Sequence, residues 1–258
     1  MKKNRPIKVG IVGVAGKMGK AIASIIINDP KTSLVAGSEF SNHKLLGKDI
    51  GVILGSKPIN ILVTDNIKDF FKDLDVVIEF GLEKATIKFL KEASKNKVAF
   101  LSGSTGLSSD TLNLMKRLSK NIPILWSPNM SIGANLLKEI AGEMAESLGN
   151  EFDIDITDIH HKNKRDVPSG TALSIKDEIN EKLKKKNIKK NINVNAIRAG
   201  DSTGEHSVIF SGKGERIIIK HLSTSRDIFA NGAVEISKWL CRQKAGYYKM
   251  KDYLAVKR

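Results

Sequence analysis

The segment Ile-Lys-Val-Gly-Ile-Val-Gly-Val-Ala-Gly-Lys-Met-Gly, residues 7–19, decides the expected fold of the N-terminal half. Its first six residues are mostly apolar and predict a short buried strand. Glycines follow at positions 13, 16 and 19, and apolar residues then recur at helical spacing from Ala21 to Ile26. The segment therefore predicts a strand, a glycine turn and a helix. Such a turn lets the backbone approach a dinucleotide's pyrophosphate, although ordinary tight turns also use glycine.

An acidic residue follows at the distance expected for a ribose-binding carboxylate. Residues 34–37 predict a second strand, and Glu39 lies just past its end, about 20 residues beyond Gly19. Because the glycine turn joins a strand to a helix and the acid follows the next strand, this context favours a dinucleotide site over a purely structural turn.

Strand and helix patterns alternate through the rest of the N-terminal half. The expected strands are residues 59–63, 75–80, 98–101 and 122–126, and the expected helices are residues 67–71, 83–95 and 110–120. This alternation predicts the α/β class with a doubly wound parallel sheet. Ligands of such sheets lie at the carboxyl ends of the strands, where the polar turns Ser102–Gly106 and Ser127–Met130 fall. Either turn is a candidate to hold a nicotinamide ring, and plain turn chemistry is the alternative.

Two histidines lie in the segment Ile-His-His-Lys-Asn-Lys-Arg-Asp-Val-Pro-Ser-Gly-Thr, residues 159–171. Before it, apolar residues at 152, 154 and 156 alternate with polar ones, which predicts a half-buried strand. His160 and His161 are therefore expected near its end. Neighbouring side chains of a strand point to opposite faces, so one histidine faces a cleft while the other packs, unless a bend at Ile159 brings both to one site.

The same segment ends at a predicted helix start. Ser169-Gly170-Thr171 precedes apolar residues at helical spacing, and a serine or threonine there can cap the first free amides. Those amides would bind an anion, the histidines can donate or accept a proton, and Lys164 can supply positive charge. The segment therefore indicates chemistry on an acidic substrate. A polar loop with surface histidines and solvated lysines is the alternative.

From residue 132 the pattern changes. A helix at 134–148, the strand before His160, a helix after Thr171 and strands at 193–198, 207–210 and 215–223 predict a smaller α+β domain with an open mixed sheet. An open sheet invites pairing with another subunit. We predict a dinucleotide-binding domain of residues 1–130 and 236–258, and a substrate-binding and oligomerisation domain of residues 131–235. Segments 129–133 and 228–232 are the expected hinges.

The composition narrows the class of protein. The chain has 258 residues, 41% of them hydrophobic and 28% charged, with a net charge of +15. No apolar run suits a membrane span or a signal peptide. The single cysteine, Cys241, cannot form an internal disulfide or a metal cluster, which fits a reducing cytoplasm. The dense lysine cluster of residues 182–190 has no interleaved aromatic residues, so we interpret it as a solvated helix end and predict no nucleic-acid partner.

These motifs together resemble the dihydrodipicolinate reductases of lysine biosynthesis, and the resemblance spans essentially the whole chain. The segments that carry it are residues 12–19, 103–106, 127–129, 160–172, 204–206 and 229–233. The block from His160-His161 to Ser169-Gly170-Thr171-Ala172 is highly specific. The resemblance implies a Rossmann-like sheet, no metal, and reduction of 4-hydroxy-tetrahydrodipicolinate, a small dicarboxylate, to tetrahydrodipicolinate by NADH or NADPH. It also implies a homotetramer formed through the open sheet.

The resemblance assigns roles to matching positions. His160 resembles the family's general acid. Lys164 resembles the partner residue that polarises or protonates the substrate as negative charge develops on it. The implied substrate-binding residues are His161, Ser169, Gly170, Thr171 and, from the cofactor side, Thr105. The implied cofactor-binding residues are Gly13, Val14, Ala15, Gly16, Lys17 and Met18 at the pyrophosphate, Glu39 at the adenosine ribose, and Gly103, Ser104, Thr105, Ser127, Pro128, Asn129 and Met130 at the nicotinamide half.

Two positions depart from the family pattern. Phe40 follows Glu39 where members that accept NADPH often carry an arginine for the 2'-phosphate, so the cofactor preference stays open; Lys17 or Lys44 could compensate. Ser104 stands where threonine is usual and keeps the hydroxyl. His206 and Arg226 are interpreted as hydrogen-bonding or ion-pair residues.

Two other classes of protein remain as alternatives. One is another two-domain dehydrogenase, of amino-acid semialdehydes or sugars. The other is a non-catalytic NAD-sensing or nucleic-acid-binding protein, which the net charge of +15 would suit.

Overall fold

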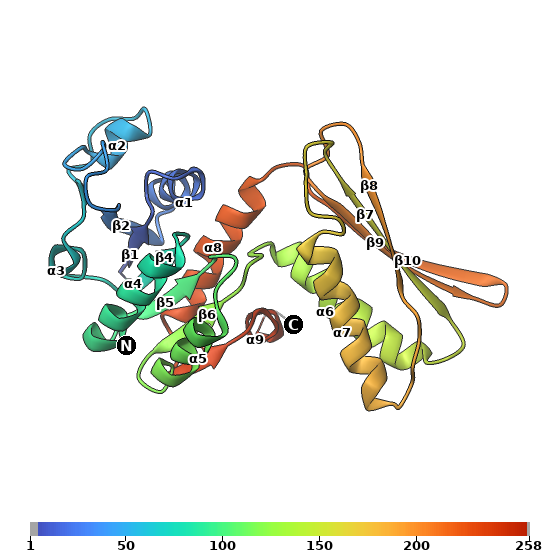
Figure 1. The fold of residues 1–258 in the computed structure, drawn as a ribbon. Helices are drawn as coiled ribbons and strands as arrows, with labels where there is room; N and C mark the ends of the chain where they lie inside the picture. The colour runs from blue at the N-terminus through green and yellow to red at the C-terminus, as the bar shows by residue number, and fades with distance from the viewer. Residues whose placement is uncertain (1–4, 257–258) are drawn as a thin grey trace. The chain divides into compact units, whose positions relative to one another are not determined.

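The computed structural model describes residues 5–256, which fall into two compact units (Figure 1). The first unit runs to Met130 and resumes at Phe229, and the second is Ser131–Ile228. By contacts the chain returns to the first unit at Phe229, inside helix α8 (Asp227–Leu240), in which Ala230 and Ala233 are buried. Both crossings fall inside the predicted hinge segments.

The first unit contains a parallel sheet, as the alternating pattern predicts. Its strands are β1 (Ile7–Val12), β2 (Thr32–Ser38), β3 (Val63–Thr64), β4 (Val76–Glu79), β5 (Ala99–Ser102), β6 (Pro123–Trp126) and β11 (Gly246–Tyr248). Their order is β11-β6-β5-β4-β1-β2-β3, and every neighbouring pair is parallel. Strand β3 shares only Val63 with the strand predicted at residues 59–63, so that prediction was misplaced, and β11 was not predicted because three residues are too few to show a period.

Helices flank this sheet. They are α1 (Lys17–Asn28), α2 (Ile50–Ile53), α3 (Ile67–Phe70), α4 (Glu83–Asn96), α5 (Ser109–Leu118), α8 and α9 (Met250–Ala255). The central strand β4 is buried along its whole length, as a parallel strand covered on both faces should be. The core between sheet and helices includes Phe70, Phe89, Phe100 and Met115. Each such side chain contributes about 2 kcal/mol by burial.

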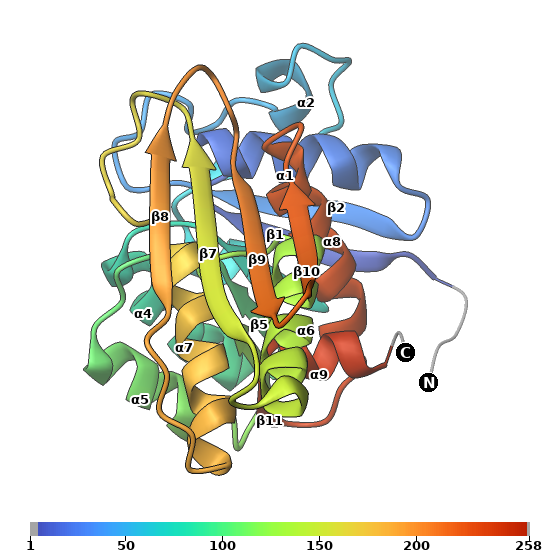
Figure 2. The same ribbon diagram turned by 90° about the vertical axis from the view of Figure 1, so that its right-hand side faces the viewer.

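The second unit is a four-stranded mixed sheet with two helices. Its strands are β7 (Asp153–His160), β8 (Asn193–Arg198), β9 (Glu205–Gly212) and β10 (Glu215–Leu222), in the order β10-β9-β7-β8. Only the β7–β8 pair is parallel. Helices α6 (Ile132–Leu148) and α7 (Gly170–Lys185) pack on one face, where alternate residues of β7 and β9 are buried (Figure 2).

The other face of this sheet is not covered by a helix of the same unit in the described part of the chain. Ile197, Ile218 and Leu222 are exposed on it, at 46%, 55% and 50%. The sequence thus yields the predicted open sheet, with apolar side chains on its open face.

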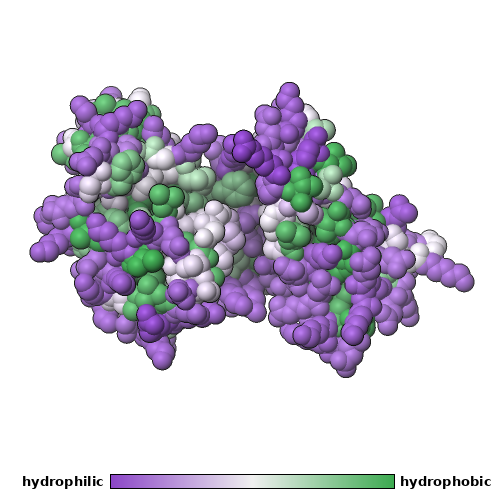
Figure 3. All heavy atoms as spheres, viewed as in Figure 1, coloured by the Kyte–Doolittle hydropathy of each residue, from purple (hydrophilic) through white to green (hydrophobic). Residues whose placement is uncertain are grey.

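Hydrophilic side chains dominate the view in Figure 3. Among residues 5–256, no helix has both the length and the apolar character that crossing a bilayer requires.

Candidate active site

The glycine turn of the first unit brings α1 close to β1. A Cβ added at Gly19 would lie 2.1 Å from the carbonyl oxygen of Gly13, so only glycine permits this packing. Helix α1 begins after Gly16, and no side chain caps that start in the described structure. The first amides of α1, those of Lys17 and Met18, therefore point away from the helix with no capping group. An uncapped helix start beside a glycine turn suits a pyrophosphate.

A cavity of about 530 Å³ opens beside this turn, wholly within the first unit. Its lining includes Gly13, Gly16, Ser38, Glu39, Phe40, Asp65, Phe80, Gly81, Lys84 and Lys88. The carboxylate of Glu39 accepts a 2.8 Å hydrogen bond from the Ala15 amide through Oε1. Glu39 is therefore fixed against the glycine turn through Oε1. The cavity's cations are Lys84 and Lys88, whereas Lys17 and Lys44 are not among its lining residues.

The turn after β5 is organised by a buried acid that the sequence analysis missed. Glu79 is fully buried, and its carboxylate accepts hydrogen bonds from the Gly81 amide and from three hydroxyls, those of Thr86, Ser102 and Ser104. Ser104 is also held through its backbone, because its amide donates to Oγ of Ser102 at 3.4 Å and its carbonyl accepts from Nε1 of Trp126 at 2.9 Å. Thr105, by contrast, is exposed at the tip of the turn.

The turn after β6 is held by its own serine. Ser127 donates a 2.7 Å hydrogen bond to the carbonyl of Asn129, and Met130 is buried. Both polar turns thus lie at carboxyl ends of adjacent parallel strands, where a sheet of this class binds ligands.

In the second unit, strand β7 runs without a break to His160. Of the two alternatives, the strand without a bend at Ile159 is the one found, because Asp158 and His160 continue the buried positions of Ile154 and Ile156. His160 therefore points into the unit, at 7% exposure. His161 follows the strand, is half-buried, and its Nε2 lies 3.4 Å from Nη2 of Arg226. A guanidinium can only donate, so this nitrogen of His161 accepts.

The predicted helix start is confirmed. Ser169 is the N-cap of α7, and its Oγ accepts a 3.2 Å hydrogen bond from the Ala172 amide. The same hydroxyl donates to Asp158 Oδ1 at 2.8 Å, and the Ser169 amide donates to Asp158 Oδ2 at 2.8 Å. Ser169 is 2% exposed, so its polar groups are engaged inside the unit, whereas Gly170 is exposed at the helix start.

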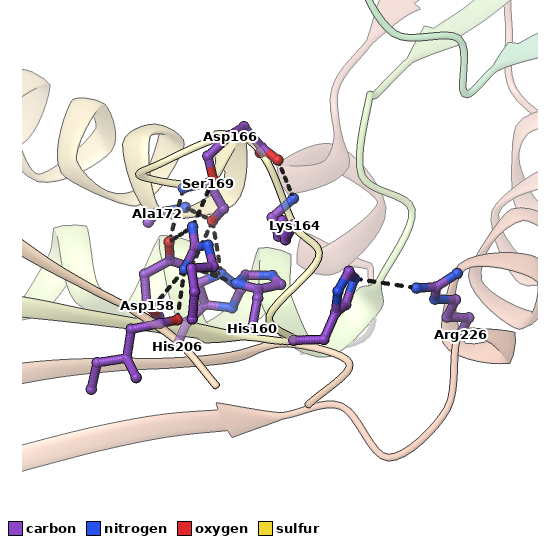
Figure 4. Close-up of polar contacts among 11 residues, drawn as sticks. Asp158, His160, Lys164, Asp166, Ser169, Ala172, His206 and Arg226 are labelled. Carbon is purple, nitrogen blue, oxygen red and sulfur yellow. Dashed lines mark hydrogen bonds and ion pairs between the residues drawn. The ribbon is translucent and has the colours of Figure 1, made fainter. Parts of the chain in front are cut away.

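Asp158 gathers further polar groups (Figure 4). Nη2 of Arg198 donates to Oδ2 at 2.9 Å, and Nε2 of His206 lies 3.3 Å from Oδ1. Nδ1 of His160 lies 2.9 Å from Oδ1 but outside hydrogen-bonding geometry, so this contact is electrostatic. Sequence reasoning missed Asp158 and Arg198, although the alternation of β7 places Asp158 on the buried face.

The charges of this cluster are strongly perturbed. Burial alone would raise the pKa of Asp158, but contacts with His206, Ser169 and Arg198 outweigh it and hold that pKa well below its ordinary value. Burial lowers the pKa of His160 to about 4, and the charge of Asp158 offsets this only in part, because neighbouring cations act against it. At pH 7 the His160 imidazole is therefore neutral in the unliganded site.

Lys164 lies on the loop between β7 and α7. Its Nζ is 2.8 Å from Oδ1 of Asp166, and this hydrogen bond lowers the pKa of the Asp166 carboxyl. A hydrogen bond from the backbone amide of Gly170 also lowers the pKa of the Asp166 carboxyl. The Asp166 carboxylate thus binds the ammonium of Lys164 and the amide of Gly170 at the start of α7. These are the groups that an anionic ligand would use.

The lysine cluster of residues 182–190 is largely solvated, as interpreted. Lys184, Lys185, Lys186 and Lys189 are exposed. Lys190 differs, because its ammonium donates to the carbonyls of Gly149, Asn150 and Phe152, just beyond α6.

Asp158, His160 and His206 bring three potential metal-ligating atoms within 4.8 Å of one another. Both oxygens of Asp158 already accept hydrogen bonds, and the guanidinium of Arg198 touches one of them. A fixed positive charge at this distance opposes a cation, so the chemistry of the cluster favours hydrogen bonding over metal binding.

Comparisons with known proteins agree over both units. The family model "Dihydrodipicolinate reductase, N-terminus" matches residues 7–130, and "Dihydrodipicolinate reductase, C-terminus" matches residues 133–254. A 4-hydroxy-tetrahydrodipicolinate reductase from Wigglesworthia glossinidia brevipalpis is 40% identical over 257 residues, covering 98% of this chain and 95% of that protein. The enzyme of the same name from Syntrophobacter fumaroxidans is 36% identical over 266 residues, covering 97% and 100%.

Solved structures show the same fold. A dipicolinate-bound dihydrodipicolinate reductase from Paenisporosarcina sp. TG-14 has a TM-score of 0.79 at 23% identity, covering 95% of this chain and 97% of that one. An amine dehydrogenase from Mycobacterium smegmatis has a TM-score of 0.69 at 9% identity, covering 95% of each chain. Several families share this fold, and the sequence matches, which span both units at up to 40% identity, show to which of them the chain belongs. The chain belongs to the dihydrodipicolinate reductase family, the pyridine-nucleotide-dependent oxidoreductases of lysine and diaminopimelate biosynthesis.

Proposed function

We propose that this chain reduces 4-hydroxy-tetrahydrodipicolinate to tetrahydrodipicolinate with NADH or NADPH. The reaction consumes one reduced nicotinamide and one proton, and the substrate hydroxyl leaves as water. The observation that carries the proposal is the placement of Lys164 and the exposed start of α7 on the loop that follows His160. A dicarboxylate entering there meets an ammonium, an imidazole and a helix N-terminus.

In this proposal His160 is the general acid and Lys164 its partner. The pKa of about 4 leaves the imidazole neutral before substrate arrives. Two substrate carboxylates close to the ring favour its charged form, so binding raises this pKa and brings a proton onto His160. The ammonium of Lys164 stabilises the negative charge that develops on the substrate ring as the hydride arrives.

The substrate carboxylates would be held at the start of α7. We assign this role to the backbone at Gly170 and Thr171, with His161 beside them. Ser169 supports the same site from inside, because its hydroxyl caps α7 and bonds Asp158. We assign the exposed Thr105 of the first unit to the substrate from the cofactor side.

The first unit fits a dinucleotide. The uncapped start of α1 with Gly13–Met18 would hold the pyrophosphate, and Oε2 of Glu39 would accept from the adenosine ribose. The turns Gly103–Thr105 and Ser127–Met130 would hold the nicotinamide half, with Ser104 fixing the shape of the first turn through its bonds to Glu79 and Trp126. A bound nicotinamide supplies the hydride.

We propose that NADH is preferred over NADPH. The lining of the cavity carries two carboxylates, Glu39 and Asp65, and Phe40 supplies no charge where a guanidinium would meet a 2'-phosphate. Phe40 is 68% exposed and packs edge-on against His43, so its ring is free to lie against an adenine. Lys84 and Lys88 supply some positive charge, which is why we expect a preference rather than exclusion of NADPH.

We further propose a cytoplasmic homotetramer formed through the open face of the second unit's sheet. The exposed Ile197, Ile218 and Leu222 on that face support it, since such side chains gain by burial. Changing Ile218 to Asp should lower the mass found by sedimentation equilibrium. An unchanged tetramer, or a wild-type monomer, would contradict this assignment.

The test of the function is the loss of absorbance at 340 nm, where reduced nicotinamide absorbs, with NADH and separately with NADPH. Substrate is generated in situ from pyruvate and aspartate semialdehyde by the preceding synthase. Loss of absorbance that requires the synthase supports the reaction. No loss from protein shown to bind NADH would instead favour a semialdehyde or sugar dehydrogenase, and tight DNA binding at physiological salt would favour the nucleic-acid alternative.

A further inference from the structure

The carboxylate of Asp158 lies at the centre of the polar contacts drawn in Figure 4. It is fully buried on β7, two residues before His160 and on the same face of the strand. A buried charge is stable only when it is paired and hydrogen-bonded. Asp158 meets this condition with groups from three places in the chain, namely the start of α7, β8 and β9.

The first connection fixes the start of α7. Both the amide and the hydroxyl of Ser169 donate to Asp158, each at 2.8 Å. Two bonds from one residue to the two oxygens of one carboxylate fix both the position and the orientation of that residue. Since Ser169 is the N-cap of α7, the amides proposed to bind substrate are thereby held at a set place relative to His160.

The second connection fixes the loop that carries Lys164. Arg198 donates to Asp158 through Nη2 at 2.9 Å, and the same nitrogen donates to the backbone carbonyl of Asp166 at 2.7 Å. The side chain of Asp166 in turn pairs with Lys164. One guanidinium therefore links the buried carboxylate to the segment that presents the ammonium.

The third connection is electrostatic. Oδ1 of Asp158 lies 2.9 Å from Nδ1 of His160 and 3.3 Å from Nε2 of His206. His206 also lies 3.2 Å from Oγ of Ser169. The negative charge favours a proton on His160, whereas the neighbouring His206, Lys164 and Arg198 oppose it.

We propose that Asp158 is a positioning residue for the reaction, which holds the α7 start and the Lys164 loop in register with His160 and supports the protonated imidazole. This inference rests on the proposed function, because it assumes that His160 and Lys164 act on the substrate. It assigns no contact between Asp158 and substrate. In this proposal His206 is a second histidine that contacts the same carboxylate and helps to hold it in place.

The test compares Asp158→Asn with the wild-type enzyme. The amide keeps the size of the carboxylate, yet it carries no charge and cannot accept at both ends. We expect kcat to fall about 100-fold and the affinity for dipicolinate, used as a stable dicarboxylate probe, to fall about tenfold. The dissociation constant for NADH should stay within about twofold, because its proposed site lies in the other unit.

A readout independent of turnover separates this proposal from the proposed function. In protein labelled with 15N-histidine, the pKa of His160 should fall in Asp158→Asn, because the supporting charge is gone. The matched control is Asp177→Asn, the same chemical change at an exposed position of α7, which should leave His160, dipicolinate binding and turnover unchanged. If the wild type shows no reductase activity, the titration and dipicolinate binding still decide the role of Asp158.

An unfolded Asp158→Asn would be explained by the buried guanidinium left without its partner. The double variant Asp158→Asn with Arg198→Gln removes both charges together and restores the balance. A folded single or double variant with wild-type kcat, dipicolinate affinity and His160 titration would overturn the proposal. So would a loss of turnover with an equal loss of NADH binding, which is the result expected of a general structural role.

Discussion

The ammonium of Lys164 lies 2.8 Å from the carboxylate of Asp166 in the unliganded chain. The Asp166 side chain is 55% exposed, so this ion pair contributes on the order of 0 to 1 kcal/mol. In the proposed reaction a substrate carboxylate would therefore displace Asp166 from Lys164 at little cost. Until then the pair would keep the ammonium near the start of α7.

Removing that ammonium should impair the reaction without touching cofactor binding. We expect Lys164→Ala to lower kcat/KM about 10² to 10⁴-fold, because it removes a charge that acts where negative charge develops. The double variant His160→Ala with Lys164→Ala should nearly abolish turnover. NADH titration by fluorescence should match the wild type for both.

Lys162 offers a matched control two residues earlier. It is exposed on the same loop and carries the same charge, so Lys162→Ala should retain most activity. Equal losses in the two single variants would mean that only the net charge of the loop matters, and the assignment of Lys164 would then be wrong.

The buried His160 should make folding stability depend on pH. Its pKa is about 4 in the folded chain, against about 6.5 for a free histidine, so the unfolded chain binds more protons between these values. The contribution of His160 to the free energy of unfolding is therefore fully present above pH 6.5. It is lost as the pH falls toward 4, and the loss is on the order of 3 kcal/mol.

Urea unfolding at pH 7 and at pH 4.5 measures this effect. We expect His160→Gln to reduce the difference between the two free energies of unfolding, whatever its stability at pH 7. Burial also lowers the pKa of His221, so part of the wild-type slope should persist. His43→Gln in the first unit is the control, and a slope in His160→Gln as steep as in the wild type would contradict the low pKa.

Cofactor preference should respond to residue 40. In Phe40→Arg a guanidinium replaces an exposed ring at the cavity that Glu39 and Asp65 line. Pairing with a 2'-phosphate should raise kcat/KM for NADPH relative to NADH about tenfold or more. Phe40→Leu, which adds no charge, should not change the ratio in this direction. If Phe40→Arg leaves the ratio unchanged, the 2'-phosphate does not lie near residue 40.

Much of the fold follows from local patterns. The glycine turn, the alternation of strands and helices, and the cap at Ser169 each depend on residues close in sequence, and each is found as predicted. The short elements α2 and β11 are too brief to show a period and were not predicted. The domain return at Phe229 depends on which unit buries the α8 side chains, which no local pattern reveals.

The candidate site was predicted less completely, for the same reason. His160, Lys164 and the α7 start lie in one short segment and were found together. Asp158 could have been predicted too, since the alternation of β7 places it inside. Arg198 and His206 reach Asp158 only through the pairing of β8 and β9 with β7. Sequence spacing carries no signal for such pairing.

Gly204 lies against the catalytic candidate in a way that a side chain would prevent. Its φ is +150°, which side-chain-bearing residues rarely adopt, and an added Cβ would lie 2.9 Å from Nε2 of His160. Since Nδ1 of His160 faces Asp158, Nε2 is the nitrogen that would exchange a proton with substrate in the proposed reaction. If His160 is the general acid as proposed, the absence of a side chain at residue 204 leaves room beside the atom that would transfer the proton.

We expect Gly204→Ala to lower kcat about 100-fold, because a methyl group against Nε2 blocks proton transfer. The backbone strain must be separated from this effect, and Gly214 allows it: its φ is +83°, with nothing within 4 Å of an added Cβ. Gly214→Ala should thus share a backbone penalty of about 1 kcal/mol but retain kcat. Steady-state kinetics with thermal unfolding of both variants makes the comparison. Equal kcat values would mean that Nε2 is not the atom that transfers the proton, and the general-acid role would have to move from His160 to Lys164.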